Sequence, residues 1–326
     1  MSNFALPMEL PKFSAAVKDV MSEFAPARLA ACVSFSLVDD DLLADAVTLL
    51  LSRLNDPVDE IRAQAVESLA VLSERGAHVE YDLLAPLLDD PCDEVRAALL
   101  QSGQLLLAEP MTAALTASRD ESELIRYSAA VLLGEFSSKD AAVSRLFELL
   151  DDKSSEIRVA AALQLGKNGN DKSAAILEQL VQNGHGQLFE AAAILCDLAL
   201  PRSRAVFLHM AQKRIVTGEA KALAIVALAH FDDENAVHAA QKFLGSWRKS
   251  RRMAVLHACA AVPHAQFAKM LATHVTYSSA EDEQSAALWA LWQTVERFAE
   301  CAEILKPLRA ALSPSQIMEL NDYANG

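Results

Sequence analysis

The chain has 326 residues, of which 52% are hydrophobic and 22% are charged, and its formal net charge is −15. This composition excludes an intrinsically disordered chain, because there is enough apolar surface to bury in a core. The negative charge argues against non-specific binding to DNA, RNA or anionic membranes, whose phosphates attract Lys and Arg. Nucleic acid is therefore not the expected partner.

The first residues of the chain indicate no targeting or membrane segment. Residues 1–13 contain Glu9 and two prolines, and they lack the basic start of a signal peptide. No run in the chain approaches the ~20 apolar residues of a membrane span, so we expect a cytoplasmic protein that binds no membrane. The sequence predicts an extended arm from Phe4 to Phe13, followed by capping helices over residues 13–24 and 27–51.

Four segments of the chain are nearly superimposable and mark internal repeats. Their Ile or Val residues (Ile61, Val95, Ile125, Ile157) are spaced by 34, 30 and 32 residues. Degenerate copies follow at similar spacing, with Leu188, Ala220, Arg252 and Glu283 at the equivalent positions, so we number the repeats one to eight. The four segments are Asp56-Pro-Val-Asp-Glu-Ile-Arg62, Asp90-Pro-Cys-Asp-Glu-Val-Arg96, Asp120-Glu-Ser-Glu-Leu-Ile-Arg126 and Asp152-Lys-Ser-Ser-Glu-Ile-Arg158.

Each repeat reads as two helices joined by a polar turn. In the second helix of repeat one, Ile61, Ala65 and Leu69 recur at i, i+4 and i+8, which makes an apolar stripe on one side of a helix. Asp56 stands where an N-cap oxygen is expected, and Pro57 stands where the first helical residue needs no N–H. Because such a unit cannot bury its faces alone, the repeats must stack.

The pattern Asp-x-x-x-Glu-Ile/Val-Arg-x-x-Ala-Ala-x-x-Leu-Gly resembles the HEAT-like repeat first described in phycobilisome lyases and found in many bacterial scaffolds. Residues 156–166 match it well, and the match weakens after repeat four. The resemblance implies a right-handed superhelix whose second helices line the concave face. It is informative about the fold and says little about the function.

We therefore predict an all-α fold, an armadillo-like α-solenoid of about eight to nine helical hairpins, forming a single domain over residues 1–326. Its predicted parts are N-terminal capping helices (1–49), regular repeats (50–170), degenerate repeats with a basic patch (171–298) and a C-terminal cap (299–326). Trp289 and Trp292 lie three residues apart on one side of a helix. We interpret them as covering the core at the end of the array, or as an apolar anchor for a partner.

Four arginines recur at the same place in repeats one to four. The family resemblance implies that they form a buried structural ladder, each bonded to acids or carbonyls of adjacent turns; the alternative is a row of guanidiniums on a binding face. They are Arg62, Arg96, Arg126 and Arg158. Repeats five to eight place Phe189, Lys221, Met253 and Gln284 at this position instead.

The charge reverses in the degenerate repeats. Residues 201–252 contain ten Lys or Arg and four Asp or Glu, which gives this segment a net charge of +6, whereas the whole chain has a net charge of −15. Cations at a helix start oppose the helix dipole, so they call for another explanation. We interpret them as a partner-binding patch on the turns of repeats six and seven, with long-range charge balance as the alternative. Its residues are Lys213, Arg214, Lys221, Trp247, Arg248, Lys249, Arg251 and Arg252.

No residue constellation predicts catalysis, a cofactor or a metal. The five cysteines are widely scattered, which indicates reduced thiols rather than a metal site. Deoxyhypusine hydroxylases, which resemble this fold, bind iron through His-Glu pairs, but none of the eight histidines here precedes a Glu. No two histidines have the i, i+4 spacing that places two ligands on one helix face.

The predicted function is a non-catalytic scaffold that binds a protein partner on its concave face or along its charged edge. Two alternatives stay open. One is a phycobilin-lyase-like protein that handles a chromophore. The other is a DNA-binding protein of the alkylpurine glycosylase type, which is also built from HEAT-like repeats.

Overall fold

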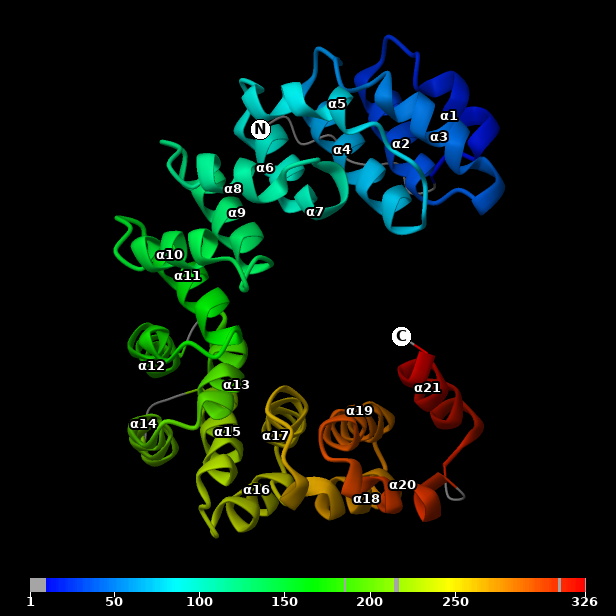
Figure 1. The fold of residues 1–326 in the computed structure, drawn as a ribbon. Coiled ribbons are helices and arrows are strands. Elements are labelled where there is room, and N and C mark those ends of the chain that lie inside the picture. Colours follow the sequence, from blue (N-terminus) through cyan, green and yellow to red (C-terminus); the bar gives the residue numbers. More distant parts are fainter. Residues whose placement is uncertain (1–9, 185, 214–216, 310–311, 326) are drawn as a thin grey trace. The chain divides into compact units, whose positions relative to one another are not determined.

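The computed structural model describes residues 10–184, 186–213, 217–309 and 312–325. They form α-helices and short 3-10 helices joined by turns, with no β-strand in these ranges (Figure 1). The predicted all-α solenoid of helical hairpins is confirmed. The chain divides into two compact units, unit 1 over residues 1–164 and unit 2 over residues 165–326, and each is described by itself.

The helices of unit 1 pair as hairpins with a first and a second helix. The pairs are α1 (Phe13–Asp19) with α2 (Ala25–Ser36), α3 (Leu43–Leu51) with α4 (Asp59–Glu74), α5 (Tyr81–Leu84) and η2 (Ala85–Asp89) with α6 (Asp93–Gln101), α8 (Pro110–Ala117) with α9 (Glu123–Gly134), and α10 (Asp140–Leu149) with α11 (Ser155–Lys167), whose last residues belong to unit 2. The short helices η1 (Asp40–Leu42) and α7 (Gly103–Leu106) precede α3 and follow α6.

Unit 2 continues with the same alternation. The pairs are α12 (Ala174–Asn183) with α13 (Leu188–Leu198), α14 (Pro201–Gln212) with α15 (Gly218–Ala227), α16 (Ala236–Leu244) with α17 (Lys249–Ala261), α18 (Ala268–Tyr277) with α19 (Glu281–Arg297), and α20 (Ala302–Arg309) with α21 (Pro314–Asn325). Short 3-10 helices join several pairs: η3 (Asp171–Ser173), η4 (Leu228–Phe231), η5 (Ala265–Phe267) and η6 (Ala299–Cys301). Repeats one to eight correspond to the pairs that contain α4, α6, α9, α11, α13, α15, α17 and α19.

The core of each unit lies between stacked hairpins. Second helices pack on one another in the orders α2–α4–α6–α9 and α13–α15–α17–α19. Ile61, Ala65 and Leu69 of α4 are fully buried, as the sequence pattern predicts. A close approach is visible where α7 meets α9, since a Cβ on Gly103 would lie 2.7 Å from a methyl carbon of Leu132.

The turn aspartates act differently from the predicted helix caps. The N-cap of α4 is Val58, two residues after Asp56, and it makes no side-chain capping bond. Asp56 Oδ1 instead accepts a hydrogen bond from the Val58 amide at 3.0 Å, the local bond of an Asx-turn. Pro57 therefore precedes the helix rather than opening it. Both oxygens of the carboxylate also accept hydrogen bonds from a side chain outside the turn.

The ends of the chain were predicted to carry an arm and caps. Residues 1–9, which include the first part of the arm, lie outside the described residues. Phe13 begins α1 and packs edge-on against Phe35, with ring centroids 5.8 Å apart. In α19, Trp292 is half-buried and Trp289 is 41% exposed.

Two features concern the environment of the chain. Among the described residues, no helix combines the length and apolar character that a bilayer crossing requires. The cysteines are all free thiols; Cys92 is half-buried and the other four are buried.

Candidate functional site

Ion pairs join consecutive hairpins of unit 1 at one repeated place. Arg62 donates to both carboxylate oxygens of Asp90, with Nε–Oδ2 and Nη2–Oδ1 distances of 2.8 and 2.7 Å. It also donates from Nη1 to the main-chain oxygen of Asp56 in its own repeat, at 2.9 Å. A guanidinium held by two oxygens of one carboxylate is fixed in direction as well as position. Each such arginine therefore sets the spacing between two neighbouring turns.

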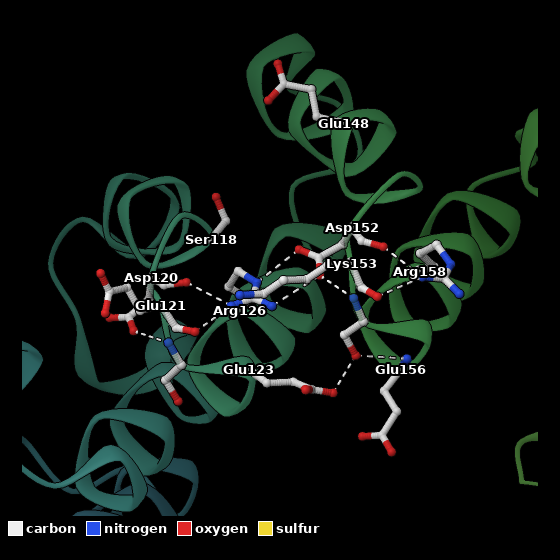
Figure 2. A network of polar contacts seen from close by, with 12 residues as sticks. Ser118, Asp120, Glu121, Glu123, Arg126, Glu148, Asp152, Lys153, Glu156 and Arg158 are labelled. Carbon is white, nitrogen blue, oxygen red and sulfur yellow. Dashed lines mark hydrogen bonds and ion pairs between the residues drawn. The ribbon is translucent and has the colours of Figure 1, made fainter.

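Repeat three contains the same arrangement, and repeat four contains its carbonyl contacts. Arg126 bonds both oxygens of Asp152 at 2.9 and 3.2 Å and the carbonyls of Asp120 and Glu121 (Figure 2). Arg158 donates to the carbonyls of Asp152 and Lys153 at 2.8 and 3.2 Å (Figure 2).

The first hairpin of the chain shares this contact, which the repeat pattern did not reveal. Arg28 in α2 donates to Asp56 from Nε at 2.7 Å and from Nη2 at 2.9 Å, and its Nη1 reaches the carbonyl of Ser22. The signal for it was the spacing, since Arg28 precedes Arg62 by the same 34 residues that separate Arg62 from Arg96.

The aspartates of these pairs are held in the charged form. Burial raises the pKa of Asp56, but hydrogen bonds from the Arg28 guanidinium and the Val58 amide outweigh it, so the pKa lies below its ordinary value. Asp90 and Asp152 behave in the same way, with Arg62 and Arg126 as their partners.

Repeat seven of unit 2 contains one related pair. Arg252 bonds the carboxylate of Glu283 at 2.7 to 3.0 Å and donates to the carbonyl of Ser246, six residues earlier. Arg252, rather than Met253, therefore occupies the ladder position, so the register differs by one residue from the predicted one. Its acidic partner belongs to helix α19 instead of a turn, and His274 bonds the same carboxylate at 3.1 Å.

The predicted partner-binding patch divides into paired and unpaired side chains. Trp247 lies in the turn between α16 and α17 and is 84% exposed. The guanidinium of Arg248 lies 5.0 Å from the centre of the indole ring, and that of Arg251 lies 5.8 Å from the ring of Phe243. Within the described ranges, neither arginine has a carboxylate at ion-pair distance. We call Trp247, Arg248 and Arg251 the Trp247 patch.

The other predicted patch residues have partners within unit 2 or lie outside the described residues. Lys249 pairs with Asp282 of α19 at 2.5 Å, in addition to the Arg252–Glu283 pair. Lys221, in α15, donates from Nζ to the main-chain carbonyl of Lys213 at 3.1 Å, at the end of α14. Arg214 is outside the described residues. The turns before the neighbouring helices α15 and α17 thus both carry cations.

A cavity of about 560 Å³ lies beside Arg252, lined by residues of α16 and α18. Arg252, His274 and Glu283 lie in its wall. The hydrogen bonds from Arg252 hold the pKa of Glu283 below its ordinary value although the residue is buried. In the described part of the chain, no group of three or more His, Cys, Asp or Glu side chains is placed to hold a metal ion.

Comparisons with known families and structures agree on the fold. Residues 46–76 and 109–196 match family descriptions of HEAT repeats. A search of curated proteins returned no match. One similar solved structure is that of YibA from Escherichia coli, 17% identical, with a TM-score of 0.50 over 67% of this chain and 81% of that one.

Two further solved structures are similar at lower scores. The CpcE–CpcF complex of phycocyanin lyase from Nostoc sp. PCC7120 is 17% identical over 73% of this chain and 96% of that one, with a TM-score of 0.48. Human deoxyhypusine hydroxylase is 15% identical over 77% and 96%, with a TM-score of 0.33. At these identities the similarity concerns the fold alone.

Proposed function

Since this chain is a HEAT-like repeat protein, we propose that it acts as a scaffold that binds an acidic segment of a protein partner through the Trp247 patch. The exposure of Trp247 carries the proposal. Indole rings bury large apolar areas and are enriched, with arginine, among the residues that contribute most to protein interfaces. An indole left 84% exposed on a turn has that area available for a partner.

The charges beside the indole favour an acidic partner. Arg248 and Arg251 have no carboxylate to neutralise them within the described residues, whereas Lys249 and Arg252 are held by Asp282 and Glu283. Arg248 stacks on the indole and leaves its N–H groups for an acceptor. An incoming carboxylate would meet two free guanidiniums without displacing an internal ion pair.

The test compares two triple variants that each remove one aromatic ring and change the net charge equally. Trp247→Ala with Arg248→Glu and Arg251→Glu alters the patch, and Phe24→Ala with Lys12→Glu and Lys18→Glu alters an exposed aromatic and two cations of unit 1. Wild type and both variants are used for affinity purification from the native lysate, with mass spectrometry of the retained proteins. We expect a partner that wild type and the control variant retain and the patch variant loses.

Salt dependence and affinity complete the test. The Kd for the purified partner should rise with ionic strength. The patch variant should raise the Kd at least about a hundredfold, since central Trp and Arg side chains commonly contribute this much binding free energy. Equal retention by all three proteins would refute the proposal. Recovery of nucleic acid or of a pigment in place of a protein would favour the glycosylase-like or lyase-like alternative.

A further inference from the structure

Unit 1 contains a cavity of about 520 Å³ between the first helices of repeats two and three. One wall is formed by α5 and η2, and the other by α8. Its floor includes Leu100, Leu107 and Ile125, which are almost fully buried. The volume lies within the range of sites that bind small molecules or single side chains of a partner.

The cavity lies at the shortest step of the repeat. Arg126 follows Arg96 by only 30 residues, against 34 for each of the two earlier steps. Helix α6 is nine residues long, whereas α4 has sixteen. At this step the arginine–aspartate distance from Arg96 to Asp120 is 3.7 Å, in place of 2.7 Å for Arg62 and Asp90. The turns are therefore not drawn together as they are at the steps of Arg28, Arg62 and Arg126.

Arg96 has a buried donor without an acceptor at this step. Its Nη1 donates to the carbonyl of Asp90 at 2.7 Å, and its Nη2 donates to Asp93 at 2.6 Å. Its Nε is buried and meets no acceptor among the described residues, although the Nε atoms of Arg28 and Arg62 each donate to the aspartate of the next turn. A buried donor without an acceptor is unfavourable. Arg96 lines the cavity, and a small shift of its side chain would bring Nε within reach of an acceptor held there.

The charges around the cavity exclude an anion as its ligand. Four carboxylates line it with the single guanidinium of Arg96, so a negative ligand would meet net repulsion. The acidic residues are Asp82, Asp89, Glu109 and Asp120. The acceptor for Arg96 Nε must therefore be neutral, and a peptide carbonyl fits this requirement.

We propose that this cavity binds a short basic segment of a protein partner. A leucine-sized side chain of the segment packs on the floor, a main-chain carbonyl accepts from Arg96 Nε, and flanking Lys or Arg residues pair with the acids of the walls. The inference rests on the proposed scaffold function and extends it to unit 1. It does not depend on the Trp247 patch, which lies in unit 2.

The binding test uses a fluorescein-labelled peptide with a central leucine between lysines and measures fluorescence polarisation with the full-length protein. Two matched peptides replace the leucine by glycine or the lysines by glutamate. We expect binding of the first peptide, about tenfold weaker binding of the glycine peptide and none of the glutamate peptide. If the glycine peptide binds as tightly as the first, the apolar floor is not used and the proposal fails.

Variants then separate the cavity from general attraction to an acidic protein. Ala113→Trp places bulk in the cavity without changing charge, with Thr116→Leu as a second filling variant on the exposed side of α8. We expect at least about tenfold weaker binding to a filled cavity. Circular dichroism, recorded during thermal melting, shows which variant is folded. The folded variant is used for the binding measurement.

A charge control completes the set. Asp82→Asn with Glu109→Gln removes two charges from the cavity, and Asp45→Asn with Glu74→Gln removes two exposed charges elsewhere in unit 1. The first pair should weaken binding about tenfold, and the second less than about twofold. Equal effects of the two pairs would show attraction to the acidic surface only and would overturn the proposal.

The most direct readout is Arg96 itself. The ¹⁵Nε–¹Hε resonance of Arg96, assigned by its loss in Arg96→Lys, should shift when the peptide is added and should not shift with hexylamine. An unmoved resonance during peptide binding, or hexylamine binding as tight as that of the peptide, would refute the site. Loss of partner binding in the Trp247 patch variant with intact peptide binding would separate failure of one proposal from failure of the other.

Discussion

The two units build the same helical hairpins with different chemistry. In unit 1, Arg28, Arg62 and Arg126 each hold an aspartate of the next turn with two hydrogen bonds. In unit 2, the one comparable pair among the described residues is Arg252 with Glu283. Regular ion pairs reproduce one spacing, whereas their absence leaves the turns of unit 2 free to carry unpaired cations.

Unit 2 also contains a cluster of ring contacts. His264 contacts His230, Phe267 and Phe298, with ring centroids 4.8, 6.3 and 5.7 Å apart. These contacts lie at the ends of second helices, away from the turns that precede them. The same repeat spacing can therefore be built with different contacts at the turns. This difference also implies that the two units respond differently to mutation and to acid.

The largest expected effect comes from breaking a buried pair in unit 1. Arg62→Ala leaves the carboxylate of Asp90, whose side chain is 6% exposed, without its counter-charge. We expect a loss of about 3–5 kcal/mol in the free energy of unfolding of unit 1, measured by urea denaturation. The matched variant Arg204→Ala breaks an exposed pair with Asp233 in unit 2 and should cost at most about 1 kcal/mol. Similar losses would remove the distinction between the units.

The next largest effect is expected below about pH 4, where acid should weaken the ion pairs of unit 1. The folded-state pKa values of Asp56, Asp90 and Asp152 lie below their ordinary range, so the unfolded chain takes up protons before the folded chain does. The stabilisation is therefore complete above the unfolded pKa of about 3.9 and is lost as the pH falls through the lower folded values. Hydrogen exchange at low pH measures this loss as the protection of the α4 amides compared with that of the α15 amides. A larger further loss of protection in α15 than in α4 below about pH 4 would contradict the expectation.

Histidine makes unit 2 sensitive at a higher pH. Burial lowers the pKa of His230 to about 4, and the nearby His264 and Arg297 add to the shift while Asp197 opposes it. The unfolded residue, with a pKa of about 6.5, binds a proton over the window from about 6.5 to 4 in which the folded residue does not. Unit 2 should therefore lose stability as the pH falls through this window.

The variant His230→Phe isolates this effect from the rest of unit 2. Its unfolding free energy, measured with urea at pH 7 and pH 5, should fall less between the two than that of wild type. An equal fall in both proteins would assign the pH dependence to other groups.

The smallest expected effect is at the Trp247 patch. Trp247→Ala removes a side chain that packs little within unit 2, so the free energy of unfolding should change by about 0.5 kcal/mol or less. Phe207→Ala, at a fully buried ring of the same unit, should cost about 3–5 kcal/mol. A loss above about 1 kcal/mol for Trp247→Ala would show that the indole stabilises the fold.

The fold of the regular repeats was predictable because one motif carries the turn, the apolar stripe and the ladder together. Arg28 escaped notice because Ser22 replaces the turn aspartate and Ala27 replaces the isoleucine before it. Arg252 was misplaced by one residue because it adjoins another arginine and its acid, Glu283, lies within a helix rather than a turn. Where the partner of a repeated contact lies on another element, sequence spacing alone no longer finds it.

The two candidate surfaces differ in how much the sequence could show. The cluster of cations around Trp247 was visible in the charge distribution, but which of them are neutralised depends on where α19 places Asp282 and Glu283. The cavity of unit 1 depends on a shortened step and on the resulting 3.7 Å gap at Arg96, a difference of about 1 Å from the other pairs. Repeat spacing at the level of residues does not resolve that distance.

The ion pair between Arg297 and Asp197 joins residues 100 positions apart within unit 2. Most solenoid contacts link neighbours, so such an array can be stretched like a spring, with each hairpin opening by a small angle. A bond from the end of α13 to the end of α19 opposes that extension until it breaks. Both side chains are partly exposed, and an exposed pair contributes little at rest. Under tension, unit 2 should therefore be stiff at first and should extend more easily once the Arg297–Asp197 ion pair has broken.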